Sequence, residues 1–244
     1  MASIRHLNLA WIMRFMKRLG TGAAGLDELL GGGLQPHTAV LVTGGCGLGK
    51  TVFCLGFLAE GAENKEPGVL ACFNESPAKM RAYAKGLGWD LAALEKKRLL
   101  LVVDAATARH GLSSQEEHVL TRFEFDDALN YVLSACAKTK AKRLAIDSLS
   151  SMPARVENRR NALFKLAASL EQAQVTAVLT AEPLGGDEGF VEEHVADTVL
   201  SLRRAGEKRL LQIKKHRGSA HSLHEHPYAI GLGGLAVEKA EFKL

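Results

Sequence analysis

The feature that most constrains this chain is a glycine-rich pattern in its first quarter. Residues 44–51, Gly-Gly-Cys-Gly-Leu-Gly-Lys-Thr, satisfy G-x-x-x-x-G-K-[ST]. The apolar run 39–43 before the pattern is typical of a buried strand, and residues 50–60 after it are typical of a helix. A strand, a glycine-rich turn and a helix N-terminus in this order predict a loop that wraps around phosphate groups.

Each residue type in this loop has a physical role. Glycines let the backbone approach phosphates with N–H groups pointing inward, and the helix dipole adds positive potential. We expect Lys50 to reach the β- and γ-phosphates and the Thr51 hydroxyl to bind Mg²⁺. The predicted nucleotide-binding residues are Gly44, Gly45, Cys46, Gly47, Leu48, Gly49, Lys50, Thr51 and Val52. The pattern does not distinguish adenine from guanine.

Composition restricts the class of protein further. A chain of 244 residues, 47% of them hydrophobic, is long enough for one α/β domain with a sizeable core. The net charge of +4 is too small to indicate nucleic-acid binding by itself. The four cysteines form no C-x-x-C pair, which favours a reducing cytoplasm, and no apolar run is long enough to span a bilayer.

The remaining chain alternates between two kinds of segment. Further apolar runs at 69–73, 98–105, 142–148 and 175–182 predict strands. Segments 77–87, 116–137 and 158–172 predict helices between them. Such alternation predicts an α/β fold with a mostly parallel central sheet and helices on both faces. Residues 197–218 and 226–240 each predict a pair of strands, hence a C-terminal antiparallel β extension.

Acidic and amide side chains follow three of these strands. Asp147 stands at the C-terminal end of an apolar strand, where a parallel sheet places its ligands, and is the predicted second Mg²⁺ contact. Asp104 follows another apolar strand and fits the same pattern. Asn74 and Glu75 follow the strand at 69–73; of the two, only Glu75 could deprotonate a lytic water.

Several stretches together resemble the KaiC-like ATPases of the RecA superfamily. They are TGAAGLDELLGGGL before the loop, then CFNESPAKMRAYAKGLGWDL, AIDSLSSM, VEEHVADTVLSL and IKKHRGSAHSLHEHPYAI. The resemblance runs from residue 21 to the C-terminus. It implies a RecA-like P-loop core over 21–244 that binds ATP and Mg²⁺ between the subunits of a homo-oligomeric ring, usually a hexamer.

The resemblance also assigns residues, and one of them departs from the family. Two consecutive Glu residues are usual where this chain has Asn74 and Glu75, which implies slow or absent hydrolysis unless Glu75 acts as the base. In the K-x-R-G-T/S stretch, Lys215 and Arg217 are implied to reach the γ-phosphate of a neighbouring subunit.

KaiC itself has two such domains in tandem and phosphorylates a Ser and a Thr in its second one. This chain has one domain, and Glu193 and His194 occupy the corresponding positions, so we expect no autophosphorylation. Residues 1–20 form an N-terminal extension in which apolar and basic residues at helical spacing suggest a short amphipathic helix. Such a helix would contact a membrane surface or a partner; the alternative interpretation is a packed or frayed terminal segment.

Other patterns weigh less. His216, His221, His224 and His226 match no metal-finger spacing and are interpreted as a polar loop. The basic residues of 203–209 lie at a predicted hairpin turn. Three hypotheses remain open: a ring-forming ATPase that regulates a partner protein, an ATP-sensing module that does not hydrolyse, and a RecA-like DNA-binding recombination ATPase. For the last, Arg155, Arg159 and Arg160 would have to serve a DNA-binding loop.

Overall fold

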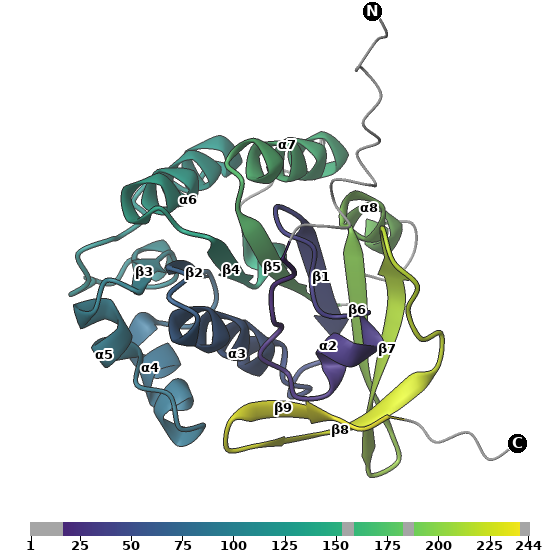
Figure 1. Cartoon of the computed structure of the whole chain (residues 1–244). Coiled ribbons are helices and arrows are strands. Elements are labelled where there is room, and N and C mark those ends of the chain that lie inside the picture. Colours follow the sequence, from purple (N-terminus) through teal and green to yellow (C-terminus); the bar gives the residue numbers. More distant parts are fainter. Residues whose placement is uncertain (1–16, 153–158, 183–187, 240–244) are drawn as a thin grey trace, which may run out of the picture.

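The computed structural model describes residues 17–152, 159–182 and 188–239. Its centre is a nine-stranded sheet with the strand order β3-β2-β4-β5-β1-β6-β7-β8-β9 (Figure 1). The strands span β1 Ala39–Gly44, β2 Gly68–Cys72, β3 Leu100–Asp104, β4 Arg143–Asp147, β5 Thr176–Ala181, β6 Thr198–Ala205, β7 Lys208–His216, β8 Glu225–Gly231 and β9 Gly234–Val237. This confirms the predicted α/β class.

Strands β3 to β6 in that order pair in parallel, and β6 to β9 pair antiparallel. The strand β6 therefore belongs to both parts: it lies parallel to β1 and forms a hairpin with β7. The predicted antiparallel extension is confirmed, and it grows from a sixth parallel strand. The carboxyl ends of the parallel strands meet at one edge, where the phosphate loop also lies.

Helices cover both faces of the sheet (Figure 1). They span α2 Leu26–Leu29, α3 Lys50–Glu63, α4 Pro77–Gly86, α5 Leu91–Lys96, α6 Phe125–Thr139, α7 Arg159–Gln172 and α8 Glu188–Val195, with short 3₁₀ turns η1 Ala108–His110 and η2 Leu149–Ser151. One buried cluster includes side chains from α3, α4 and α5, and a second includes side chains from α6 and α7. Within β4, Ala145 faces the first cluster, and Leu144 and Ile146 face the second, as strand alternation requires.

The predicted helix 116–137 is wrong in its first part. The helix α6 begins only at Phe125, after Glu124, and carries Asp126 and Asp127 in its first turn, where they favour the helix dipole. The preceding residues are not helical because they form an isolated bridge to β3: the N–H of Asp104 donates to the carbonyl of His118. Pairing with the sheet therefore overrides the helical pattern before residue 125.

The N-terminal boundary of the packed structure lies before residue 20. Leu19 is buried in the core and pairs with Leu34 through two backbone hydrogen bonds. Gly22 has φ 72°, and a Cβ there would stand 2.2 Å from the carbonyl oxygen of Gly56, so only glycine fits. Of the suggested amphipathic helix in residues 1–20, residues 1–16 lie outside the described residues, and residues 17–20 are not helical, because Leu19 forms a β-bridge with Leu34. Among the described residues, no helix is long and apolar enough to cross a membrane.

Candidate nucleotide-binding site

The glycine-rich loop between β1 and α3 has the backbone shape that its sequence predicts. Gly47 and Gly49 have φ of 75° and 93°, in the left-handed region that favours glycine, and α3 begins at Lys50. The loop is supported from the C-terminal extension: the hydroxyl of Tyr228 in β8 donates to the carbonyl of Leu48 at 2.6 Å. A Cβ on Gly49 would stand 2.7 Å from Cδ1 of Ile230, so β8 also restricts position 49.

The ammonium group of Lys50 lies over the loop itself. Its Nζ donates to the carbonyl oxygens of Gly44 at 2.7 Å and Gly45 at 3.0 Å. The N–H groups in the first turn of an α-helix have no carbonyl acceptor within the helix. The N-terminal end of α3 therefore carries partial positive charge. Cation, loop and helix end together form a site suited to an anion with several oxygens.

The strand β4 delivers Asp147 to the first turn of α3. The Thr51 hydroxyl donates to the Asp147 carboxylate at 3.0 and 3.2 Å. On the other side, the Thr180 hydroxyl of β5 donates to Asp147 Oδ1 at 2.9 Å and accepts the N–H of Ser148 at 2.7 Å. Because Ser148 has φ 72°, an unfavourable value for serine, the Thr180 contact helps hold the turn that orients Asp147.

Burial dominates the electrostatics of Asp147. Only 5% of Asp147 is exposed, and burial raises the pKa of its carboxyl group. The hydrogen bonds from Thr180 and Thr51 and the charge of Lys50 oppose that increase in pKa, and the charge of Glu75 adds to it. The carboxylate therefore lies where a cation would be strongly attracted.

The other candidate for this role, Asp104, has a different place. Its carboxylate accepts the N–H groups of Ala106 and Thr107 and the hydroxyl of Ser114, so it fixes the turn after β3. It does not line the cleft at the phosphate loop. The structure thus separates the two aspartates that the sequence left as alternatives.

The loop borders an open cleft of about 390 Å³. Its lining residues are Cys46, Gly47, Gly49, Lys50, Thr51, Val52, Asn74, Glu75, Tyr83, Asp147, Ser148, Thr180, Ala181, Glu182 and Ile230. Asn74 is exposed, and Glu75 forms an ion pair with Lys79 at 2.9 Å. The two predicted water-handling residues therefore share one cleft with the phosphate loop and Asp147.

The donor set fits a nucleotide with Mg²⁺. Magnesium binds oxygen ligands and keeps several waters, so one hydroxyl and one carboxylate at the edge of a phosphate site suffice. Thr51 and Asp147 are such a pair. A Cβ at Gly47 would meet nothing within 4 Å, so the loop is open to the cleft at that point. Bound Mg²⁺ would neutralise negative charge on the phosphates.

The structure does not bring Lys215 and Arg217 into this cleft. Lys215 Nζ donates to the carbonyls of Glu193, His194 and Ala196 at the end of α8, and burial lowers its pKa. The Arg217 guanidinium binds Asp197 at 3.1 Å. Both cations thus close the C-terminal end of α8 in this chain, at a place separate from the cleft of the same chain.

The histidine-rich stretch has a structural explanation. His216 is buried, its Nδ1 lies 2.8 Å from the Thr198 hydroxyl, and burial with the charge of Arg18 lowers its pKa to about 4. His226 lies 2.7 Å from the hydroxyl of Ser222. Within the described ranges, no group of three or more His, Cys, Asp or Glu side chains is placed to hold a metal.

The sequence missed several residues of the cleft. Thr180 and Glu182 stand at the end of β5, beside Asp147, and Tyr83 and Ile230 come from α4 and β8. The position of β5 next to β4 could have indicated Thr180, since neighbouring parallel strands end at one edge. No sequence signal pointed to Tyr83 or Ile230, which reach the cleft only through tertiary packing.

Comparison with known proteins agrees with this fold. The family model described as the KaiC ATPase matches residues 19–241. A UPF0273 protein of Methanopyrus kandleri is 34% identical, over 91% of this chain and 92% of its own. The circadian clock oscillator protein KaiC of Parathermosynechococcus lividus is 36% identical, over 92% of this chain but only 43% of its own length.

A solved structure supports the same assignment. The crystal structure of a KaiC-like protein from Pyrococcus horikoshii has a TM-score of 0.77 and 33% identity, covering 91% of this chain and 99% of that chain. The glycine-rich phosphate loop, placed on a RecA-like sheet, assigns this protein to the P-loop ATPase fold class. The chain belongs to the KaiC ATPase family.

Proposed function

We propose that this protein binds Mg-ATP and hydrolyses it slowly, as a homo-oligomeric ring with nucleotide between subunits. The observation that supports this most directly is the contact of the Thr51 hydroxyl with Asp147 beside the glycine loop, because a hydroxyl and a carboxylate placed there are suited to hold Mg²⁺ on a nucleotide. Lys50 would bind the β- and γ-phosphates. In this proposal the ring is a hexamer that regulates a partner protein.

Within this proposal, Glu75 orients and deprotonates the lytic water, and Asn74 binds water without being able to accept its proton. Lys215 and Arg217 act on the nucleotide of the neighbouring subunit, where cations stabilise charge on the transferring phosphoryl group. Glu193 and His194 offer no Ser or Thr hydroxyl, so no autophosphorylation is part of the proposal. The chain acts as one ATPase domain; its predicted boundary at residue 21 moves before Leu19, which packs in the core.

One alternative is an ATP-sensing module that assembles on ATP without cleaving it, which Asn74 favours. A DNA-binding recombination ATPase has weaker support. Arg159 is ion-paired with Glu192, Arg160 lies 5.8 Å from the ring of Phe164, and Arg155 falls outside the described residues. Both described arginines thus already have partners within the chain, whereas single-stranded DNA binding calls for a basic groove with aromatic platforms.

The proposal is tested by measuring phosphate release from Mg-ATP across a range of protein concentrations, with particle size measured in the same samples. We expect release per chain to rise as rings form, because Lys215 and Arg217 act between subunits. The variant Lys50→Ala is the control that should bind no ATP. Rings that keep ATP intact would favour the sensing module, and release that is independent of assembly would contradict a role for the two cations in trans.

The two residues after β2 give a paired prediction. Glu75→Gln should lower phosphate release about a hundredfold, since general-base catalysis contributes at least that much. Asn74→Glu should raise release about tenfold or more, because it adds a carboxylate beside the cleft. Asn74→Gln is the matched control, which lengthens the side chain without adding a base. Full activity in Glu75→Gln would place the base elsewhere, and an unchanged Asn74→Glu would show that Asn74 does not limit turnover.

A further inference from the structure

The strand β3 ends the sheet and leaves part of its backbone without a partner. β2 pairs along all of β3, whereas on the outer side only Asp104 is engaged, through His118 and Leu120. Backbone groups alternate between the two sides of a strand. Leu100 and Val102 therefore share the outer side with Asp104, and their N–H and C=O groups have no hydrogen-bond partner among the described residues.

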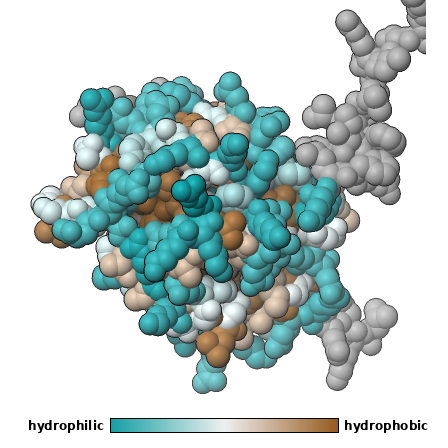
Figure 2. Space-filling view, turned by 60° about the vertical axis from the view of Figure 1, so that its left-hand side comes forward, coloured by the Kyte–Doolittle hydropathy of each residue, from teal (hydrophilic) through white to brown (hydrophobic). Residues whose placement is uncertain are grey.

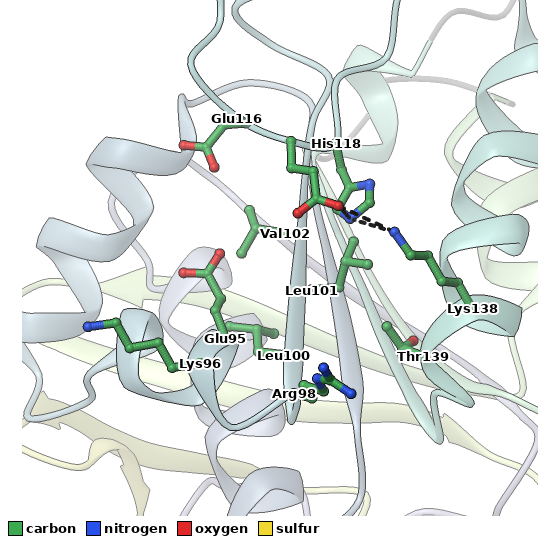
Figure 3. Close-up of a pocket in the computed structure, with 11 residues that line it drawn as sticks. Glu95, Lys96, Arg98, Leu100, Leu101, Val102, Glu116, His118, Lys138 and Thr139 are labelled. Carbon is green, nitrogen blue, oxygen red and sulfur yellow. Dashed lines mark hydrogen bonds and ion pairs between the residues drawn. The ribbon is translucent and has the colours of Figure 1, made fainter.

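This open edge lies at the bottom of a cavity of about 590 Å³ (Figure 3). Its walls come from three places: the end of α5, the loop residues 116–118, and the end of α6. Leu100, Leu101 and Val102 lie between these walls, and charged side chains stand around them in Figure 3. On this side of the molecule, Figure 2 shows an apolar area surrounded by hydrophilic residues.

Some of the charged side chains around this cavity, called the groove below, form ion pairs and others do not. Glu95 and Glu116 both bind Arg81, at 2.7 and 2.6 Å, and Glu117 pairs with Lys138 at 3.4 Å. Lys96 and Arg98, at the N-terminal end of β3, have no ion pair within the described part of the chain. The end of the groove where β3 begins is therefore positive.

Charged residues near an edge strand also protect a sheet from aggregation, so the choice of occupant needs an argument. A second copy of the chain fits poorly, because its own β3 edge is recessed behind the same walls and two recessed edges cannot reach one another. An extended peptide has no such walls. The free groups of two alternate residues match a short strand of about three to five residues.

We propose that the open edge of β3 binds an extended segment of a partner protein as an added strand, with an acidic residue of that segment against Lys96 and Arg98. Backbone hydrogen bonds to Leu100 and Val102 would provide affinity, and the positive end of the groove would set orientation. This surface does not use the nucleotide cleft, so the proposal is independent of ATP hydrolysis.

The test uses the full chain and a positional-scanning library of acetylated hexapeptides. We expect selection of Asp or Glu at one end and of apolar residues at alternate positions. The best peptide is then made with N-methyl groups on alternate amides, in each of the two possible phases. One phase should lose at least tenfold in affinity and the other should bind like the parent, because only one set of N–H groups faces β3.

Protein variants locate the site. Arg98→Glu, or Lys96→Glu if the first does not fold, should weaken binding of the acidic peptide at least tenfold. Lys97→Glu is the matched control: it is exposed, carries the same charge change, and does not line the groove. Three outcomes would each overturn the proposal: the library selects no peptide, both N-methylated peptides lose affinity equally, or Lys97→Glu weakens binding as much as Arg98→Glu. Pairing of two chains through β3, measured as an oligomer that Arg98→Glu dissociates, would overturn it in favour of self-association.

Discussion

Replacing Arg143 with Met lowers the free energy of unfolding by about 3–5 kcal/mol, the usual cost of removing one partner from a buried ion pair. Arg143 is the first residue of β4, yet its side chain is only 1% exposed. It binds Glu66 through two hydrogen bonds of 2.6 and 2.8 Å. It also donates to the carbonyls of Gly20 at 2.7 Å and Phe57 at 2.8 Å, and its guanidinium lies 4.6 Å from the Phe57 ring centre.

Methionine would fill much of the same space but could satisfy none of these acceptors. The N-terminal segment at Gly20, the helix α3 at Phe57 and the loop at Glu66 would all lose their common donor. The site is also tight: a Cβ on Gly61 would stand 2.4 Å from Arg143 Cδ, so the surrounding structure is shaped to the arginine. The effect should appear in denaturant unfolding at fixed protein concentration, so that any assembly is held constant.

Glu66→Gln is the matched control for charge alone, because glutamine keeps an acceptor for Arg143. We expect a smaller loss of unfolding free energy than in Arg143→Met. Glu66 is partly exposed, and Arg143 still donates to the carbonyls of Gly20 and Phe57. The double variant should cost less than the two single changes added together, because both remove the same contact. A loss below about 1 kcal/mol in Arg143→Met would contradict this account, since that is the range of exposed pairs.

Arg143 also shows where sequence reasoning stops. The run at 142–148 correctly predicted β4, because four of its residues are apolar or small and the strand is buried on both sides. The pattern could not show that its first arginine is buried, because the partners come from positions 20, 57 and 66. Burial of a charged side chain depends on tertiary contacts that no local pattern records.

In the candidate site too, some residues follow from local sequence patterns and others depend on tertiary contacts. The loop, Lys50, Thr51 and Asp147 follow from local rules: a glycine-rich turn between strand and helix, and a carboxylate at a strand end. The expected start of the helix at residue 116 was wrong because residues near 118 pair with β3, a contact distant in sequence. Thr180, Tyr83 and Ile230 were missed for the same reason, since each reaches the cleft from another element.

The substitution Asp147→Asn should have opposite effects with and without ligand. Without nucleotide, we expect the substitution to raise the free energy of unfolding by about 1 kcal/mol. The variant should then melt about 2–4 °C higher than the original protein. Burial raises the pKa of Asp147, so the folded state disfavours its ionised form. That unfavourable contribution is absent below the pKa of the unfolded chain and appears as pH rises through the raised pKa of the folded state. Asparagine removes it while still accepting from Thr51 and Thr180.

With Mg-ATP, the variant should melt at a lower temperature than the original protein. A ligand at a hundred times its dissociation constant stabilises the folded state by about 2.7 kcal/mol, and the variant should lose the Mg²⁺-dependent part of that gain. Thermal melting with ATP, with and without Mg²⁺, measures both effects at pH 7. The pH dependence of the ligand-free melting temperature should also flatten in the variant above the pKa of an ordinary aspartate.

Asp104→Asn is the matched control, a buried aspartate at the end of a parallel strand in the same sheet. It should lower the melting temperature, because asparagine keeps the oxygen that accepts from Ala106 and Thr107 but replaces the oxygen that accepts from Ser114 with an NH₂ group, and it should leave the response to Mg-ATP intact. If Asp147→Asn kept the Mg²⁺ response, the metal would be held elsewhere and the proposed site would be wrong. If it lowered the ligand-free melting temperature instead, the hydrogen bonds to Asp147 would outweigh its burial, and the cleft would be arranged to keep that carboxylate charged before any cation arrives.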